Sequence, residues 1–227
     1  MGEREELKPK APLLREIKRG KPEDKYIPIT LVTGRGEISC RYYPVRGAYL
    51  GTIWVGGVGG DFDTPARGLY PKLSEALREY NIASLWVSYR HPASIEESVY
   101  DVMAGIIFLE SEGIYRIALV GHSFGGAVVI QAAARSGSVK VVVALATQSY
   151  GAEEVSELSP DCSILLIHGA DDTVLPSSNS RRVFEMAHEP KKLIILQENG
   201  HNLEKAAGEV EKLVREWVVS RLIPLQK

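Results

Sequence analysis

The chain has 227 residues, the length of a single α/β domain, and its 44% hydrophobic and 25% charged residues are those of an ordinary globular protein. This composition excludes a disordered, collagen-like or fibrous chain. Lys and Arg number 27 and Asp and Glu number 29, so the net charge of −2 provides no basic field to attract nucleic acid. Two cysteines, Cys40 and Cys162, are too few for a disulfide framework.

The sequence carries no recognisable targeting signal or membrane segment. Met1–Glu6 is charged where a secretory signal peptide requires apolar residues. The longest apolar run, Val141–Ala146, has six residues, against about 18 for a membrane helix. We therefore expect a cytoplasmic protein with no membrane partner and no nucleic-acid partner.

The first 25 residues are rich in charge and proline, which predicts an N-terminal extension over residues 1–25 and a single domain over residues 26–227. Within the extension, Leu13, Leu14 and Ile17 could share one face of a short helix over Pro12–Lys18. Two segments rich in β-branched and aromatic residues follow, joined by a glycine-containing turn, and they predict a β-hairpin. They are Tyr26–Thr33 and Glu37–Tyr43.

From residue 50 onward, short apolar runs alternate with helical patterns. The runs do not alternate polar with apolar residues, so we expect strands buried on both faces, as in a parallel sheet. With the hairpin they make eight strands, and the interleaved helices predict one layered α/β domain. The 17-residue connection Thr147–Ser163 is too short to hold a cap domain. The runs are Leu50–Val55, Ile82–Ser88, Arg116–Val120, Val139–Ala146, Ile164–Ile167 and Leu193–Leu196.

The strongest chemical signal is the segment Gly121–Gly126, which reads Gly-His-Ser-Phe-Gly-Gly. It lies between an apolar run and the small-residue stretch Ala127–Ala134, the strand–turn–helix context that a G-x-S-x-G nucleophile elbow requires. Such a turn strains the serine backbone and needs neighbours without side chains, which Gly121 and Gly125 provide. The helix that follows directs its N-terminal amides toward developing negative charge. Ser123 is therefore the candidate nucleophile.

A serine hydroxyl needs a base that is oriented by a third group. His201 lies after the last predicted strand, and Asp171 and Asp172 follow the strand Ile164–Ile167. These loops come directly after strands, at the sheet edge where sites of open parallel sheets form. The residues alone leave the choice between the two aspartates open. Weaker candidates for the base are His91, His122, His168 and His188.

Over about residues 26–222 the sequence resembles the α/β-hydrolase superfamily. The resemblance is carried by the elbow, by the H-G-x-x-D-x-x-x-P loop over residues 168–176 and by the late Gly200-His201. It implies an eight-stranded, mostly parallel sheet whose second strand is antiparallel. It also implies ester hydrolysis through an acyl-enzyme, with Ser123 as nucleophile, Asp172 as acid and His201 as base.

The lack of a cap is similar to the compact dienelactone-hydrolase and small-carboxylesterase branch. Dienelactone hydrolases usually have Cys in place of Ser123, so their substrate is not carried over. The resemblance also implies an oxyanion hole made by the backbone amides of Val58 and Phe124. The family's loop often begins His-Gly, whereas this chain has Gly56-Gly57. No His, Cys or Asp cluster has metal-ligand spacing, so we expect no metal and no cofactor.

These features predict a serine hydrolase acting on small-molecule carboxylic esters. One alternative is a peptidase or acyl-peptide hydrolase. It rests on the elbow and acid loop of this chain, which are also similar to those of prolyl-oligopeptidase-type enzymes. That reading would be favoured by a large substrate-gating domain. A second alternative is a non-catalytic binding protein on a hydrolase scaffold, against which the complete Ser, Asp and His set argues. No oligomeric state follows from the sequence.

Overall fold

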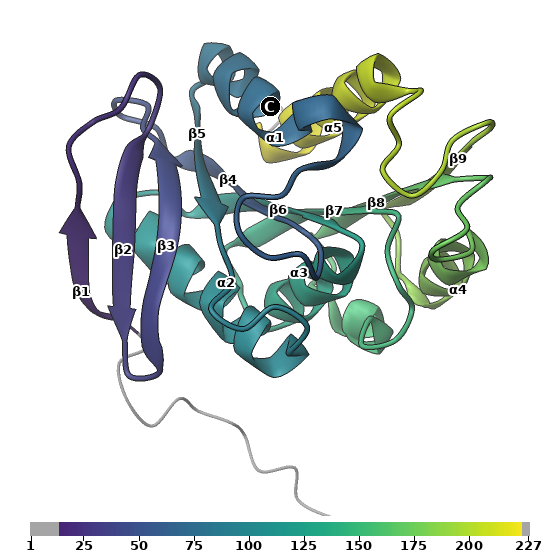
Figure 1. Cartoon of the computed structure of the whole chain (residues 1–227), viewed down its shortest axis with the longest axis horizontal. Helices are drawn as coiled ribbons and strands as arrows, with labels where there is room; N and C mark the ends of the chain where they lie inside the picture. Colours follow the sequence, from purple (N-terminus) through teal and green to yellow (C-terminus); the bar gives the residue numbers. More distant parts are fainter. Residues whose placement is uncertain (1–13, 224–227) are drawn as a thin grey trace, which may run out of the picture.

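The computed structural model describes residues 14–223, and within them nine strands form one sheet in the order β1-β2-β3-β5-β4-β6-β7-β8-β9 (Figure 1). The strands are β1 (Leu14–Arg19), β2 (Ile27–Thr33), β3 (Gly36–Tyr43), β4 (Leu50–Val55), β5 (Ile82–Val87), β6 (Arg116–His122), β7 (Val139–Leu145), β8 (Ser163–Gly169) and β9 (Lys191–Leu196). The helices are α1 (Pro65–Ala76), α2 (Ile95–Ser111), α3 (Phe124–Ala134), α4 (Ser178–Met186) and α5 (Ala207–Leu222). Two short 3₁₀ helices are η1 (Leu77–Tyr80) and η2 (Glu153–Glu157).

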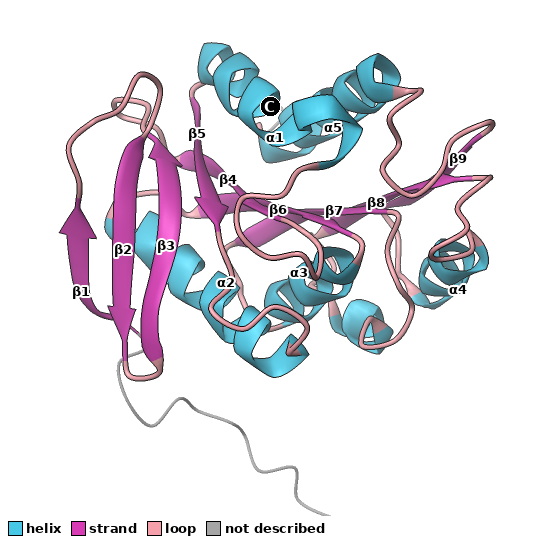
Figure 2. Ribbon diagram, in the orientation of Figure 1, coloured by secondary structure: helices cyan, strands magenta, loops and turns pink. Residues whose placement is uncertain are grey.

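Six neighbouring strands of the sheet are parallel, namely β5, β4, β6, β7, β8 and β9. The strand β3 is antiparallel to both of its neighbours, β2 and β5. Every residue of β4, β5 and β8 is buried, as their unbroken apolar sequences predict. Helices cover both faces: α1 and α5 lie on one, and α2, α3 and α4 on the other (Figure 2). This is the predicted mostly parallel α/β-hydrolase architecture.

Successive side chains of the central strands enter two different cores. In β4, Ile53 and Val55 pack in the core that contains α2 and α3, whereas Trp54 packs in the core that contains α1 and α5. This alternation is the two-residue period of a strand that is buried on both sides. Between β7 and β8 the only regular element is η2, in agreement with the predicted absence of a cap. None of the helices in residues 14–223 is long and apolar enough to cross a bilayer.

The first strand corrects the sequence prediction. A helix over Pro12–Lys18 is wrong for its described part, because Leu14–Arg19 forms β1 and pairs antiparallel with β2. A short isolated helix is marginal in water, whereas β1 gains a ladder of hydrogen bonds and buries part of Leu14 and Ile17 against the core. Pro12 and Leu13 lie outside the described residues. The sheet therefore has nine strands rather than eight, and it begins within the segment predicted as an extension.

A buried ion pair fixes the turn that follows β5. Asp101 of α2 is fully buried and accepts hydrogen bonds from the backbone amide of Arg90 (2.8 Å) and from its Nε (2.6 Å). The Arg90 guanidinium also donates to Glu97 (2.8 Å). Burial raises the pKa of Asp101, although the hydrogen bonds from Arg90 oppose this effect. The pair anchors the loop at the carboxyl end of β5 to α2.

We predict that Asp101→Ala lowers the free energy of unfolding by about 1–3 kcal/mol, because it leaves the Arg90 amide and Nε without their buried acceptor while Glu97 still pairs with the guanidinium. The matched control is Glu37→Ala, which breaks the ion pair between Glu37 and Lys18. The Lys18 side chain is 50% exposed and the Glu37 side chain 57% exposed. That pair should be worth less than about 1 kcal/mol. Urea denaturation of both variants measures the difference, and equal losses would contradict the prediction.

Candidate active site

Ser123 lies in the turn between β6 and α3, with φ 57° and ψ −120°. Residues other than glycine rarely adopt a positive φ, and such strain persists only where the surroundings impose it. Here the amide of Ser123 donates to the carbonyl of Leu145 in β7 (2.8 Å), and its own carbonyl accepts from Gly126 (3.0 Å). The turn is thereby fixed on both sides of the serine.

Two glycines allow the turn to pack as closely as it does. A methyl group at Gly121 would overlap the carbonyl oxygen of Gly125, and one at Gly125 would overlap the carbonyl oxygen of Gly56. The elbow therefore excludes any side chain at either position. This is the steric requirement that the G-x-S-x-G spacing predicts.

His201 brings the turns after β6, β8 and β9 together. Its Nε2 lies 2.9 Å from Ser123 Oγ, and its Nδ1 lies 2.7 Å from Asp172 Oδ2. A neutral imidazole has one donor and one acceptor nitrogen. Because the carboxylate can only accept, Nδ1–H donates to Asp172 and Nε2 accepts the Ser123 hydroxyl. The three residues that the resemblance assigns to the reaction thus form one continuous hydrogen-bonded chain.

Asp172 receives four hydrogen bonds. Its Oδ1 accepts from the amides of Val174 (2.9 Å) and Leu175 (2.8 Å), and its Oδ2 accepts from His201 and from His168 Nε2 (3.1 Å). Burial alone would raise the pKa of Asp172, but the hydrogen bonds from His201, Leu175 and Val174 outweigh it and lower the pKa. The carboxylate is therefore ionised at neutral pH.

Asp171 is placed differently. Its side chain is exposed, and its backbone amide donates to the carbonyl of Asn199 (2.9 Å). Of the two adjacent aspartates that the residues alone left open, only Asp172 contacts His201. Asp172, the aspartate that the resemblance implies as the acid, is thus the one that contacts His201.

His122, considered from the sequence only as a weaker candidate for the base, contacts His201 in the structure. Its Nε2 lies 3.0 Å from the carbonyl oxygen of His201, and the two rings are 4.9 Å apart. Burial lowers the pKa of His122 to about 4, so the ring is neutral and Nε2–H donates to that carbonyl. In the sequence, the only indication that His122 belongs to the site is its position directly before Ser123. Of the other weaker candidates, His91 is exposed, and His188 is exposed and bonds the carbonyl of Ser156 (2.9 Å).

The loop after β4 lies directly beside Ser123. A methyl group at Gly57 would be only 3.5 Å from Ser123 Cβ. Within residues 14–223, neither the amide of Val58 nor that of Phe124 has a protein acceptor. The free amide of Phe124 directly follows Ser123, and amides in such a position can donate to a negatively charged oxygen.

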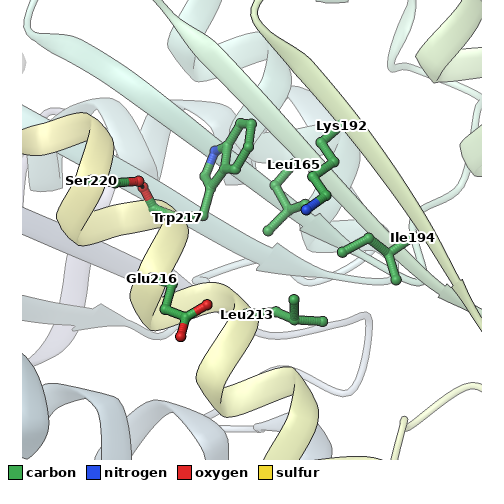
Figure 3. A pocket seen from close by; sticks show the side chains of 7 residues that line it. All are labelled: Leu165, Lys192, Ile194, Leu213, Glu216, Trp217 and Ser220. Atoms are coloured by element: carbon green, nitrogen blue, oxygen red, sulfur yellow. Dashed lines mark hydrogen bonds between the residues drawn. The ribbon is translucent and has the colours of Figure 1, made fainter.

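Three other features of residues 14–223 concern metal-ligand groups, the two cysteines and a surface pocket. In residues 14–223 no group of three or more His, Cys, Asp or Glu side chains is arranged to hold a metal ion. Both cysteines are buried, and burial raises the pKa of Cys162 to about 12, so neither is a thiolate. A shallow pocket of about 190 Å³ lies between α5 and the strands β8 and β9, and none of its lining residues belongs to the Ser123 site (Figure 3).

We predict that His122 makes the protein less stable as the pH falls. Its folded-state pKa of about 4 is below the roughly 6.5 of an unfolded histidine, so the unfolded chain binds more protons between these values. This group should then cost about 2 kcal/mol of unfolding free energy between about pH 7 and 5. His122→Gln should remove that part of the slope, whereas His188→Gln should leave it unchanged. Urea titrations across this pH range measure both, and an unaltered slope in His122→Gln would refute the assignment.

Solved structures with a similar fold include several hydrolases of low sequence identity. A dienelactone hydrolase from Anabaena variabilis superposes with a TM-score of 0.75 at 18% identity, covering 92% of this chain and 100% of that one. Est1E from Butyrivibrio proteoclasticus gives 0.74 at 15% identity, covering 86% and 98%. XC6422 from Xanthomonas campestris, described as a serine hydrolase without a lid, gives 0.71 at 18% identity, covering 90% and 98%.

No curated protein sequence matches this chain. The sequence model of one family does match it, over residues 66–214, a range that contains Ser123, Asp172 and His201. With the fold and this match together, the chain belongs to the dienelactone hydrolase family.

Proposed function

We propose that this protein is a serine hydrolase that cleaves small carboxylic esters through an acyl-enzyme. The observation that carries the proposal is the hydrogen-bonded chain Ser123–His201–Asp172, with distances of 2.9 and 2.7 Å. The family adds support, because a lactone is itself a cyclic carboxylic ester.

In the proposed reaction, His201 takes the proton of the Ser123 hydroxyl as the oxygen attacks the ester carbonyl. Asp172 keeps His201 in the tautomer whose Nε2 is free to accept, and it stabilises the imidazolium that forms. The amides of Val58 and Phe124 bind the oxyanion, where one donor typically contributes about 10²–10³ in rate. His201 then protonates the leaving alcohol, and water releases the acyl group by the same steps.

A small substrate is favoured by the open surroundings of Ser123. Val58, which follows Gly57 on the loop after β4, is 56% exposed, and Val174, two residues after Asp172, is 65% exposed. In this proposal, these exposed side chains would provide apolar contact to a compact acyl or alcohol group. Est1E has been solved with ferulic acid, a compact aromatic acid, bound to it.

The experiment that tests this function measures turnover of p-nitrophenyl esters of graded acyl length and labelling by a fluorophosphonate probe. We expect hydrolysis of short esters and covalent labelling, both lost in Ser123→Ala with a fall in kcat of about 10³-fold or more. Faster cleavage of acyl-peptide substrates than of esters would favour the peptidase alternative. Neither labelling nor turnover of any substrate would indicate a binding protein on a hydrolase scaffold.

A second prediction separates the adjacent aspartates. Asp172→Asn should lower kcat by about 10⁴-fold, because the amide cannot hold the productive tautomer of His201. Asp171→Asn, at the exposed neighbouring position, should retain most activity. Turnover of one activated ester, with circular dichroism to verify folding, compares the two variants. An inactive Asp171→Asn beside an active Asp172→Asn would overturn the assignment.

A further inference from the structure

His168 lies behind Asp172 and has no part in the reaction as described above. It is fully buried near the end of β8, four residues before Asp172. Its Nε2 lies 3.1 Å from Asp172 Oδ2 and 2.9 Å from the carbonyl oxygen of Leu175. Its Nδ1 lies 2.6 Å from Oγ of Ser180, a buried residue of α4. Both ring nitrogens therefore have partners.

These partners determine which nitrogen carries the hydrogen. Nε2 faces two oxygens that can only accept, so it must be the donor, and its single hydrogen is shared between the Leu175 carbonyl and Asp172 Oδ2. Burial lowers the pKa of His168, so the ring is neutral and Nδ1 accepts the hydroxyl hydrogen of Ser180. The His168 tautomer is thereby fixed: Nδ1 accepts from Ser180 of α4, and Nε2–H points toward the Asp172 carboxylate.

Asp172 Oδ2 is thus shared between two imidazoles, with His201 Nδ1 at 2.7 Å and His168 Nε2 at 3.1 Å. The other oxygen, Oδ1, is held by the amides of Val174 and Leu175. Rotation of the carboxylate about its Cβ–Cγ bond would break all of these bonds together. Four donors occupy the roughly four acceptor sites of the carboxylate, so both of its oxygens are held in place.

We propose that His168 is a positioning residue, which holds Asp172 in the orientation from which it bonds His201. This inference rests on the proposed function, since it concerns the same hydrogen-bonded chain. Its second effect is electrostatic. An N–H that donates to Oδ2 disperses the negative charge there, so Asp172 attracts a proton on His201 less strongly than a free carboxylate would.

One further titratable group contacts His201, and a second acts on that neighbour. His122, at the end of β6, lies against the His201 ring, and Asp63, on the loop after β4, exerts its charge on His122. Neither contacts His168, whose polar partners are Asp172, Leu175 and Ser180. We therefore expect the effect of a substitution at His168 on His201 to be transmitted by the hydrogen bonds of Asp172.

The test compares His168→Met with His168→Gln. The two side chains are nearly equal in size, but only glutamine places N–H groups near the position of Nε2. We expect His168→Met to lower kcat about 10–100-fold with little change in KM. We also expect the acid limb of its kcat/KM profile to move up by roughly half a pH unit or more, because the imidazolium is held more strongly. His168→Gln should recover most of both effects.

Thermal unfolding of each variant verifies that it folds, and His188→Met serves as the control for a histidine remote from the site. The His201 ring resonances are then titrated by NMR in a Ser123→Ala background, with and without His168→Met, which gives a readout independent of turnover. An identical His201 titration in both backgrounds, or equal kcat values for His168→Met and His168→Gln, would overturn the proposal. Failure of the proposed function itself would be distinguishable, because the unsubstituted protein would then show no turnover and no fluorophosphonate labelling, or Ser123→Ala would leave turnover intact.

Discussion

The backbone of Ser123 is held at φ 57° and ψ −120°, and the geometry of the site depends on this constraint. A conformation of this kind costs about 1–3 kcal/mol and survives only where neighbouring structure imposes it. The imposing structure is the parallel sheet: β7 accepts the Ser123 amide, and the loop after β4 packs against Gly125. Because the side chain projects from this strained turn, its hydroxyl reaches His201, and Ser123 as a whole is only partly buried.

Parallel strands also explain why residues distant in the sequence meet. Ser123, Asp172 and His201 follow β6, β8 and β9, whose carboxyl ends lie along one edge of the sheet. A side chain on any turn at that edge is then close to the others without a long loop. Buried polar groups at this edge must be satisfied by one another, and the four hydrogen bonds to Asp172 are the clearest instance.

The sequence predicts the parts of the molecule that obey local rules. The continuous apolar runs predict the buried parallel strands, and the glycine spacing predicts the elbow at Ser123. The strand Leu14–Arg19 escapes prediction because its conformation comes from pairing with β2, not from its own residues. The choice of Asp172 over Asp171 needed a family resemblance, since adjacent residues on a loop have no periodicity. The contacts of His122 arise only in the tertiary fold, because its partner is the backbone of a residue 79 positions away.

The charges of β1 have a consequence for the outer border of the sheet. A terminal strand presents unpaired N–H and C=O groups to solvent, and such a border can template the addition of a strand from another molecule. Four of the six residues of β1 are exposed, and all four are charged: Arg15, Glu16, Lys18 and Arg19. Pairing with a foreign strand would require these side chains to lose hydration, which disfavours it. Without β1, the border would instead be β2, whose Leu31 is fully buried and whose sequence, Ile-Pro-Ile-Thr-Leu-Val-Thr, contains no charge. Among the strands of residues 14–223, β1 therefore gives the sheet a charged border, which disfavours pairing with a strand of another molecule.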